Sequence, residues 1–244
     1  MFFQSPVLAG DSAAFRLEIK APVTRWDEAV PLGNGLTGCL VWGERNQLYF
    51  SFDRGDLWDN RIPGELKEPG FTYANIRKLV KERNNEELSR LTLKPFNCPY
   101  PTKLPGVRLE LEMRPDFDAE TFNLDMARAV CTVEPVSGKP VTLFTSATQP
   151  VTLIRCPEYV RASLSVPASL KLLGYPEQQT SREGDNLWWR QKTAGELEYG
   201  AYLAVKKVNS EYLIAISITS NEDDRDFMAL AKRQAGEALE KGFT

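Results

Sequence analysis

The sequence contains no histidine among its 244 residues. This absence removes Ser-His-Asp and Cys-His catalytic arrangements, and with them the commonest general base of enzymes. It also excludes zinc sites that use histidine ligands.

Cysteine is scarce, with four residues scattered along the chain and no CxxC pair. Cys131 and Cys156 lie in apolar, strand-like segments, and we expect both to be small buried hydrophobic residues. The positions of Cys39 and Cys98 give no support to a disulfide framework. We therefore expect neither a metal site nor a cofactor.

The chain also lacks an excess of charge of either sign, since its formal net charge is −3 and no lysine- or arginine-rich stripe stands out. Nucleic acid and anionic membranes are therefore not expected as partners. No apolar run approaches the roughly 18–20 residues of a membrane span. The N-terminal stretch MFFQSPVLAGDSAAF has no basic segment before a long apolar one, so no signal peptide is legible.

What the sequence does hold is a share of hydrophobic residues typical of globular proteins, 42%, much of it in short strand-like segments. Residues 107–113 alternate strictly between apolar and polar, which is typical of a strand with one wet face in an antiparallel sheet. Roughly a dozen such segments at hairpin spacing predict a mainly β fold, a large antiparallel β-sandwich over residues 1–220. The segments are 15–20, 37–43, 47–52, 107–113, 127–135, 140–148, 151–156, 160–166, 186–193, 201–208 and 212–219.

Two segments have a helical pattern. Residues 73–93 place apolar side chains at three- and four-residue spacing, and Asn84-Asn85 divides them into two short helices. Residues 221–244 begin with a polar turn that can cap a helix and continue as an amphipathic, alanine-rich stretch. The apolar face of this last helix can pack on the sandwich or on another domain.

The first candidate functional cluster is WDEAVPLGNGLTG, residues 26–38. Its glycines permit positive φ or close backbone approach, and Asn34 tolerates the left-handed region. A strand follows, so the cluster is neither a phosphate-binding loop nor a dinucleotide-binding turn. Two interpretations stay open: a tight turn into a strand, or a loop whose amides and Asn34 side chain, beside Trp26, meet a ligand or a neighbouring domain.

The second cluster is DRGDLWDN, residues 53–60. The spacing of its aspartates does not match an EF-hand calcium loop, and no bidentate glutamate closes it. Asp53 and Asp56 can pair with Arg54 or cap the turn. Trp58 can be buried or can offer a flat apolar face to a sugar ring.

Two further features bear on carbohydrate chemistry. Glu28 and Asp53 are one example of a carboxylate pair, the arrangement that glycoside hydrolysis uses, but the sequence does not supply the separation that such a mechanism needs. Trp188 and Trp189 are neighbours in a strand and point to opposite faces. At most one of them is therefore expected in the core, and the other is open to sugar binding or to coverage by another domain.

The order of these motifs resembles the N-terminal domain of glycoside hydrolase family 95, which contains α-L-fucosidases and related α-L-galactosidases. That family opens with Trp-x-Glu-Ala-x-Pro-x-Gly-Asn-Gly-x-x-Gly, which residues 26–38 match, and continues with Leu-Asn-Glu-Asp-x-Leu-Trp, to which residues 51–58 are similar. The segment SFDRGD departs from the second motif, which indicates a remote relative. The likeness extends loosely over residues 20–244, including the helical stretch 73–93 and the final helix.

The resemblance implies a supersandwich of the galactose-mutarotase type, followed by a linker helix at 221–244 that leads to an (α/α)6 catalytic barrel. In that family the general acid and base lie in the barrel, so we expect this chain to be a non-catalytic N-terminal domain that buttresses the barrel and is inactive by itself. Trp26, Asn34, Asp53, Asp56 and Trp58 are the candidates for a substrate-binding or interdomain lip.

Carbohydrate and the catalytic barrel of the same polypeptide are the expected partners, and the family's exported members imply a periplasmic or extracellular location. The alternative is an autonomous carbohydrate-binding module that uses exposed tryptophans such as Trp58 or Trp188.

Overall fold

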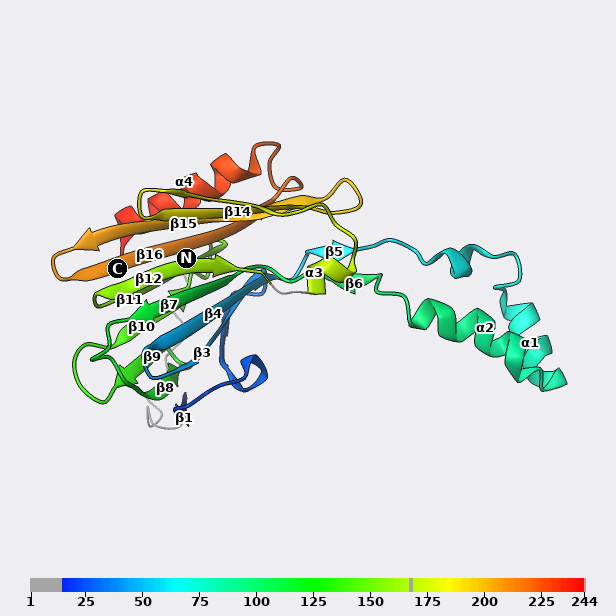
Figure 1. The fold of residues 1–244 in the computed structure, drawn as a ribbon, viewed down its shortest axis with the longest axis horizontal. Helices are drawn as coiled ribbons and strands as arrows, with labels where there is room; N and C mark the ends of the chain where they lie inside the picture. Colours follow the sequence, from blue (N-terminus) through cyan, green and yellow to red (C-terminus); the bar gives the residue numbers. More distant parts are fainter. Residues whose placement is uncertain (1–14, 167–168, 244) are drawn as a thin grey trace, which may run out of the picture.

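A computed structural model describes residues 15–166 and 169–243, which form two antiparallel sheets and a short two-stranded ribbon (Figure 1). This arrangement confirms the predicted mainly β sandwich. The nine-stranded sheet has the order β1 (Arg16–Lys20), β8 (Ala119–Asp125), β9 (Val130–Pro135), β10 (Val141–Thr145), β11 (Val151–Cys156), β16 (Glu211–Ser220), β15 (Glu198–Val208), β14 (Asn186–Lys192) and β13 (Gln179–Glu183). The five-stranded sheet has the order β12 (Tyr159–Ser165), β7 (Arg108–Met113), β4 (Gln47–Arg54), β3 (Thr37–Glu44) and β2 (Val30–Gly33). The ribbon pairs β5 (Trp58–Asp59) with β6 (Thr102–Lys103).

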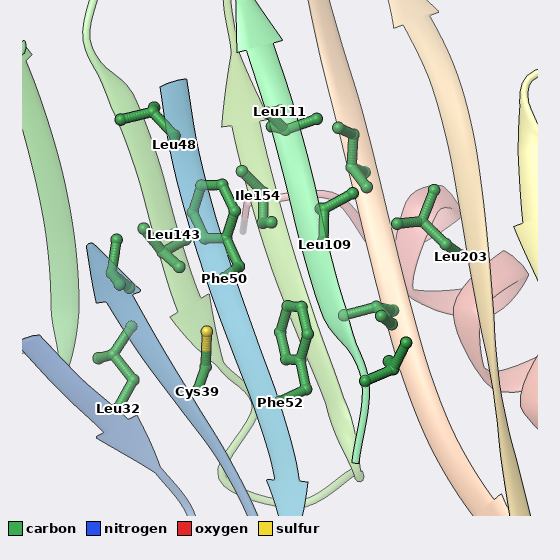
Figure 2. Packing of buried hydrophobic residues seen from close by; sticks show 14 of the residues in the cluster. Leu32, Cys39, Leu48, Phe50, Phe52, Leu109, Leu111, Leu143, Ile154 and Leu203 are labelled. Carbon is green, nitrogen blue, oxygen red and sulfur yellow. The ribbon is translucent and has the colours of Figure 1, made fainter. Parts of the chain in front are cut away.

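A single hydrophobic core fills the space between the two sheets. Phe50 of β4 and Leu109 of β7 come from the five-stranded sheet, and Ile154 of β11 and Leu203 of β15 from the nine-stranded sheet (Figure 2). All four side chains have no exposed surface. The alternation predicted for residues 107–113 is confirmed, because every second residue of β7 is buried and the residues between them are half-buried. The half-buried set therefore forms the outer face of the five-stranded sheet.

The C-terminal helix α4 (Phe227–Lys241) covers the outer face of the nine-stranded sheet over β11, β15 and β16 (Figure 1). Ala231 and Ala235 are fully buried there against Tyr202 and Ala215. This contact explains why β16 is an almost continuous apolar run: it is buried on both of its faces. Of the two predicted positions for the apolar face of this helix, the structure shows packing on the sandwich.

Residues 60–101 leave the sandwich between β5 and β6 and form what we call the helical arm (Figure 1). The arm contains the 3-10 helix η3 (Gly64–Lys67) and the helices α1 (Tyr73–Glu82) and α2 (Asn85–Phe96). Thr72 and Asn84 accept hydrogen bonds as the N-caps of the two helices, and Arg83 ends α1 with φ of 56°. The predicted division of this stretch into two helices is confirmed.

Two short helices complete the described structure: the 3-10 helix η2 (Trp26–Glu28) and α3 (Ser169–Leu172). Cys131 and Cys156 are buried and unpaired, as predicted, and burial raises the pKa of each thiol to about 12. Among the described residues, no helix has both the length and the apolar character needed to span a membrane.

Candidate functional site

The two Gly/Asn/Asp/Trp clusters meet at one end of the five-stranded sheet. Gly38 of β3 lies opposite Asp53 of β4 in the antiparallel register. Just past the hairpin, the N–H of Gly55 donates to the carbonyl oxygen of Leu36 at 2.7 Å. Because β3 and β4 are hairpin partners, residues 26–38 and 53–60 form one structural unit rather than two separate loops.

The side chain of Asn34 joins the turn between β2 and β3 to the opposite sheet. Its Nδ2 donates to the carbonyl oxygen of Ser146 at 2.8 Å and to that of Gln149 at 3.1 Å. Its Oδ1 accepts from the backbone N–H groups of Leu36 at 3.0 Å and Thr37 at 2.8 Å. Both ends of the amide are therefore engaged inside the protein, and Asn34 acts as a bridge between the sheets.

Arg54 is the centre of an ion-pair network, although it is 2% exposed. Its guanidinium donates to both carboxylate oxygens of Asp56, at 3.0 and 2.6 Å, and to both of Asp223, at 2.6 and 3.1 Å. A further bond reaches the carbonyl oxygen of Ile218 at 3.0 Å. Burial by itself lowers the pKa of Arg54, but the two carboxylates outweigh it and raise the pKa above its usual range. The DRGD sequence is thus an internal clamp between β4 and the end of β16.

A buried carboxylate, Asp59, fixes the root of the helical arm. It accepts from the Arg61 guanidinium at 2.7 Å and from the Tyr175 hydroxyl at 2.5 Å. Arg61 also donates to the carbonyl oxygen of Leu173 at 2.9 Å and lies 3.9 Å from the ring centre of Tyr100. Burial raises the pKa of Asp59, but these hydrogen bonds outweigh it and lower the pKa below its usual range. Sequence reasoning did not single out this network, although the adjacent Asp-Asn-Arg pattern was visible.

A cavity of about 500 Å³ opens on the outer face of the five-stranded sheet, beside these clusters. Trp26 lines this cavity, and 60% of its surface is exposed. Asp53 also lines it and is half-buried. Gly106 forms part of the wall, where a Cβ atom would lie 2.3 Å from the carbonyl oxygen of Phe52. The other lining residues are Leu32, Gly38, Cys39, Leu40, Ser51, Phe52, Pro105, Val107 and Arg108.

A stack of aromatic and guanidinium groups continues the same face from the cavity. The rings of Trp42 and Tyr49 are stacked with their centres 4.3 Å apart, and the Arg108 guanidinium lies 4.9 Å from the Trp42 ring centre. Ser51 accepts hydrogen bonds from Trp42 Nε1 at 3.1 Å and from Arg108 Nε at 3.3 Å. Sequence reasoning missed this group, whose only sequence signal is the alternation of polar and apolar residues in β3, β4 and β7.

The structure separates the five predicted lip residues by their surroundings. Trp26 and Asp53 line the cavity. Asn34 and Asp56 are engaged in the bridge and the clamp described above. Trp58 is 46% exposed, donates from its Nε1 to the carbonyl oxygen of Gly55 at 2.9 Å, and is not part of the cavity lining.

The tryptophan pair of β14 divides as predicted. Trp189 is fully buried, and its Nε1 donates to Gln178 Oε1 at 3.0 Å. Trp188 lies on the opposite face, half-buried beside the cluster that α4 covers. In the part of the chain that the structure describes, no group of three or more His, Cys, Asp or Glu residues is placed to hold a metal ion.

Comparison with known proteins agrees with the fold and motifs. Residues 17–224 match the family described as Glycosyl hydrolase family 65, N-terminal domain. The chain is also similar to "Alpha-L-fucosidase 2" of Arabidopsis thaliana, with 29% identity over 85 residues. That alignment covers 34% of this chain and 10% of the fucosidase. The chain therefore spans a small part of the length of this relative.

Both comparisons support the predicted remote resemblance to the N-terminal domain of a fucosidase-type glycoside hydrolase. The family match runs from β1 to the turn before α4, so it includes the sandwich, the helical arm and both motif clusters. It covers most of the chain. This chain belongs to the family of glycosyl hydrolase family 65 N-terminal domains.

Proposed function

We propose that this chain is the non-catalytic N-terminal domain of a glycoside hydrolase, and that its helical arm packs against the catalytic domain of the same polypeptide. The uncovered apolar surface of the arm carries this proposal. Tyr73 is 80% exposed and Phe96 is 83% exposed, and three further large apolar side chains of the arm are more than half exposed. These three are Ile62, Val80 and Leu93.

The arm buries so little apolar surface that we do not expect its helices to be stable without a further packing partner. In its two helices, Leu79 and Leu91 are the buried residues. Helices of 10 and 12 residues are marginal by themselves, because most helix stability in proteins comes from tertiary packing. Several large apolar side chains that are exposed on one element of a soluble protein suggest an interaction site. A second domain that covers the arm would bury these side chains and stabilise the two helices.

The root of the arm gives it a defined direction. Asp59 and Arg61 lie where the arm leaves β5, and they join it to Tyr175, which follows α3. Arg54 and Asp56 of the clamp lie a few residues upstream in the same strand-and-turn unit, and Asp223 joins them to the turn after β16. A rigid root suits a docking element, because little conformational entropy is lost there on association.

The length of the fucosidase relative supports a separate catalytic domain, since the aligned part is a tenth of that protein. The hydrolytic activity, the carbohydrate substrate and the periplasmic or extracellular setting belong to the same proposal. The role of α4 as the linker towards the barrel is also part of this proposal. The lip role of Trp26 and Asp53 is supported by their shared cavity.

The alternative function, an autonomous carbohydrate-binding module, is favoured by one observation. Trp26 and Trp58 are both about half exposed, at 60% and 46%, near the same end of the five-stranded sheet. Exposed aromatic rings are suited to stacking on sugars. The alternative leaves the exposed apolar side chains of the arm without a role.

The test compares association of this chain with a catalytic domain supplied as a separate polypeptide, using wild type and a Tyr73→Ser/Phe96→Ser double variant. We expect the double variant to weaken association at least tenfold while the melting temperature of the sandwich stays unchanged. Val160→Ser is the matched control, because Val160 is a 59% exposed apolar residue of β12 outside the arm. Equal association of all three proteins would overturn the proposal.

A further inference from the structure

We propose that the cavity beside Trp26 is a saccharide subsite that takes a single neutral pyranose ring. The inference rests on the proposed function, because association with a glycoside hydrolase supplies the carbohydrate class. It goes further by assigning the ring to one cavity and to three side chains, Trp26, Asp53 and Arg108. The volume of about 500 Å³ lies within the range of about 300–1,000 Å³ that is common for small-molecule sites.

The lining of the cavity matches the two-sided chemistry of a pyranose ring. A pyranose has C–H groups on its flat faces and hydroxyl groups around its edge. Leu40 and Pro105 supply apolar wall, and Trp26 adds an exposed indole. Such apolar and aromatic surface suits the C–H face. The few polar groups around it suit the hydroxyl edge.

Asp53 and Arg108 each keep polar atoms that make no hydrogen bond to the described residues. Within the described part of the chain, the hydrogen bonds to the Asp53 carboxylate, from the Arg54 N–H and from Lys103 Nζ, all reach Oδ1. The Arg108 guanidinium is held by its Nε bond to Ser51, and no bond from its two terminal nitrogens to the described residues is found. Asp53 Oδ2 is therefore available as an acceptor, and the two terminal nitrogens of Arg108 are available as donors. Sugar hydroxyl groups both donate and accept, so they can bind to either.

The charges at the cavity favour a neutral ligand. The lining holds charged groups of both signs, the Asp53 carboxylate and the Arg108 guanidinium, so an ionised ligand of either sign meets one group of its own sign. The nearby Lys103 ammonium pairs with Asp53 at 2.6 Å. A neutral sugar satisfies both lining groups by hydrogen bonding, whereas an apolar protein side chain in the same space would leave them without partners at a cost in free energy.

The cavity wall is held in place before any ligand arrives. Arg108 is fixed between the Trp42 ring and Ser51, and the Trp42 ring is stacked on Tyr49. Gly106 lies so close to β4 that no larger residue fits without a shift of the backbone. Preorganised walls reduce the entropy lost on binding. Such preorganisation is expected of a ligand-binding site, whereas a surface loop without a ligand does not need it.

The experiment titrates the 244-residue chain with L-fucose, D-galactose, D-glucose and D-glucuronate, and follows the indole N–H signals by NMR. We expect saturable shifts of the Trp26 signal with at least one of the three neutral sugars, with a dissociation constant of about 1 mM. Trp26→Ala should weaken binding at least tenfold, and Trp26→Phe should retain part of it. Trp58→Ala is the matched control and should bind as the wild type does.

Three results would overturn the inference: no saturable binding of a neutral sugar, loss of binding in Trp58→Ala rather than Trp26→Ala, or tighter binding of D-glucuronate than of the neutral sugars. The melting temperature of each variant confirms that it is folded, which is expected because Trp26 is largely exposed. Failure here leaves the docking of the arm intact, because that docking is measured by association with the catalytic domain. Failure of docking likewise leaves sugar binding by this chain measurable.

Discussion

The guanidinium of Arg54 lies 2.6 Å from the carboxylate of Asp223, a residue that follows it by 169 positions in the sequence. Asp56 binds the same guanidinium, also at 2.6 Å at its closest, and the Arg54 side chain is 2% exposed. Asp223 in turn accepts from the backbone N–H of Ser220 at 2.8 Å. The three charged residues thereby lock the end of β4 to the turn that leads into α4.

Replacing Arg54 by alanine should lower the free energy of unfolding by about 1.5–3 kcal/mol, because the buried guanidinium loses its hydrogen bonds to two charged carboxylates. The carboxylates themselves stay partly solvated, since the side chains of Asp56 and Asp223 are 43% and 29% exposed. Urea unfolding followed by circular dichroism measures the change. The matched control is Arg114→Ala, since Arg114 pairs with Asp116 and Glu158 on an exposed surface, where such pairs contribute about 0–1 kcal/mol. Equal destabilisation by both variants would contradict the role of the clamp.

Asn34 should be needed for stability more than for ligand binding. Asn34→Ala removes its hydrogen bonds to both sheets and should cost about 1–3 kcal/mol of unfolding free energy. Asn34→Asp keeps an acceptor for Leu36 and Thr37 but cannot donate to Ser146 and Gln149. It is therefore expected to be destabilised as well. If Asn34→Asp is as stable as the wild type and sugar binding is lost, the bridge between the sheets is the wrong explanation.

Acid should loosen the root of the helical arm. The pKa of Asp59 is held below its usual range by Arg61 and Tyr175, despite burial that acts in the opposite direction. A lowered pKa in the folded state gives stability that is present above the unfolded pKa, about 3.9, and is lost as the pH falls through the folded value. We expect the melting temperature of the wild type to fall below about pH 4.

The variant Asp59→Asn should be less stable at neutral pH and should show a smaller loss on acidification, as measured by thermal melts between neutral pH and about pH 3. Asp116→Asn serves as the control, because the Asp116 side chain is 78% exposed. Identical pH profiles for wild type and Asp59→Asn would show that another group governs the acid transition.

The elements predicted from the sequence are those whose pattern is local. The alternation in β7 reports one wet face, and the break at Asn84-Asn85 separates α1 from α2. The continuous apolar run of β16 also identifies a strand, since it is buried on both faces. In each case the periodicity of a few neighbouring residues carries the information.

The strands that sequence reasoning missed lack such a pattern. All five residues of β13 are exposed at the edge of the nine-stranded sheet, so hydrophobic periodicity does not mark them. In β8 the register shifts between Ala119 and Thr121, which interrupts the alternation. The strand β2 has four residues, one of them Pro31 at the edge of its sheet, and the prediction treated this stretch as a turn.

The site could be predicted in part. Trp26 and Asp53 were identified by residue type, and they line one cavity. Arg108 was not identified, because it reaches the cavity through the pairing of β7 with β4, which the sequence does not specify. Asn34 and Arg54 also have local partners, but Ser146, Ile218 and Asp223 lie 112 or more positions away, so the bridge and the clamp depend on the tertiary fold.

The isolated chain should not hydrolyse aryl glycosides. In the proposed function, catalysis belongs to another domain. Asp53 accepts a hydrogen bond from Lys103 and lines the cavity, and it has no catalytic role. Release of nitrophenol from aryl α-L-fucosides and α-glucosides measures the activity. Robust turnover by the purified chain that disappears in Asp53→Asn would show that the chain is itself an enzyme.

Hydrogen exchange of the helical arm shows whether a catalytic domain covers it. The backbone amides of α1 and α2 would be compared by mass spectrometry in the 244-residue chain alone and in a polypeptide that joins it to the catalytic domain. We expect fast exchange in the isolated chain, because the arm buries little apolar surface. We expect strong protection in the longer polypeptide, where the catalytic domain covers Tyr73 and Phe96. Amides of the core strand β7 are the internal reference and should be protected equally in both proteins. Equal exchange of the arm in the two proteins, whether fast or slow, would contradict the account.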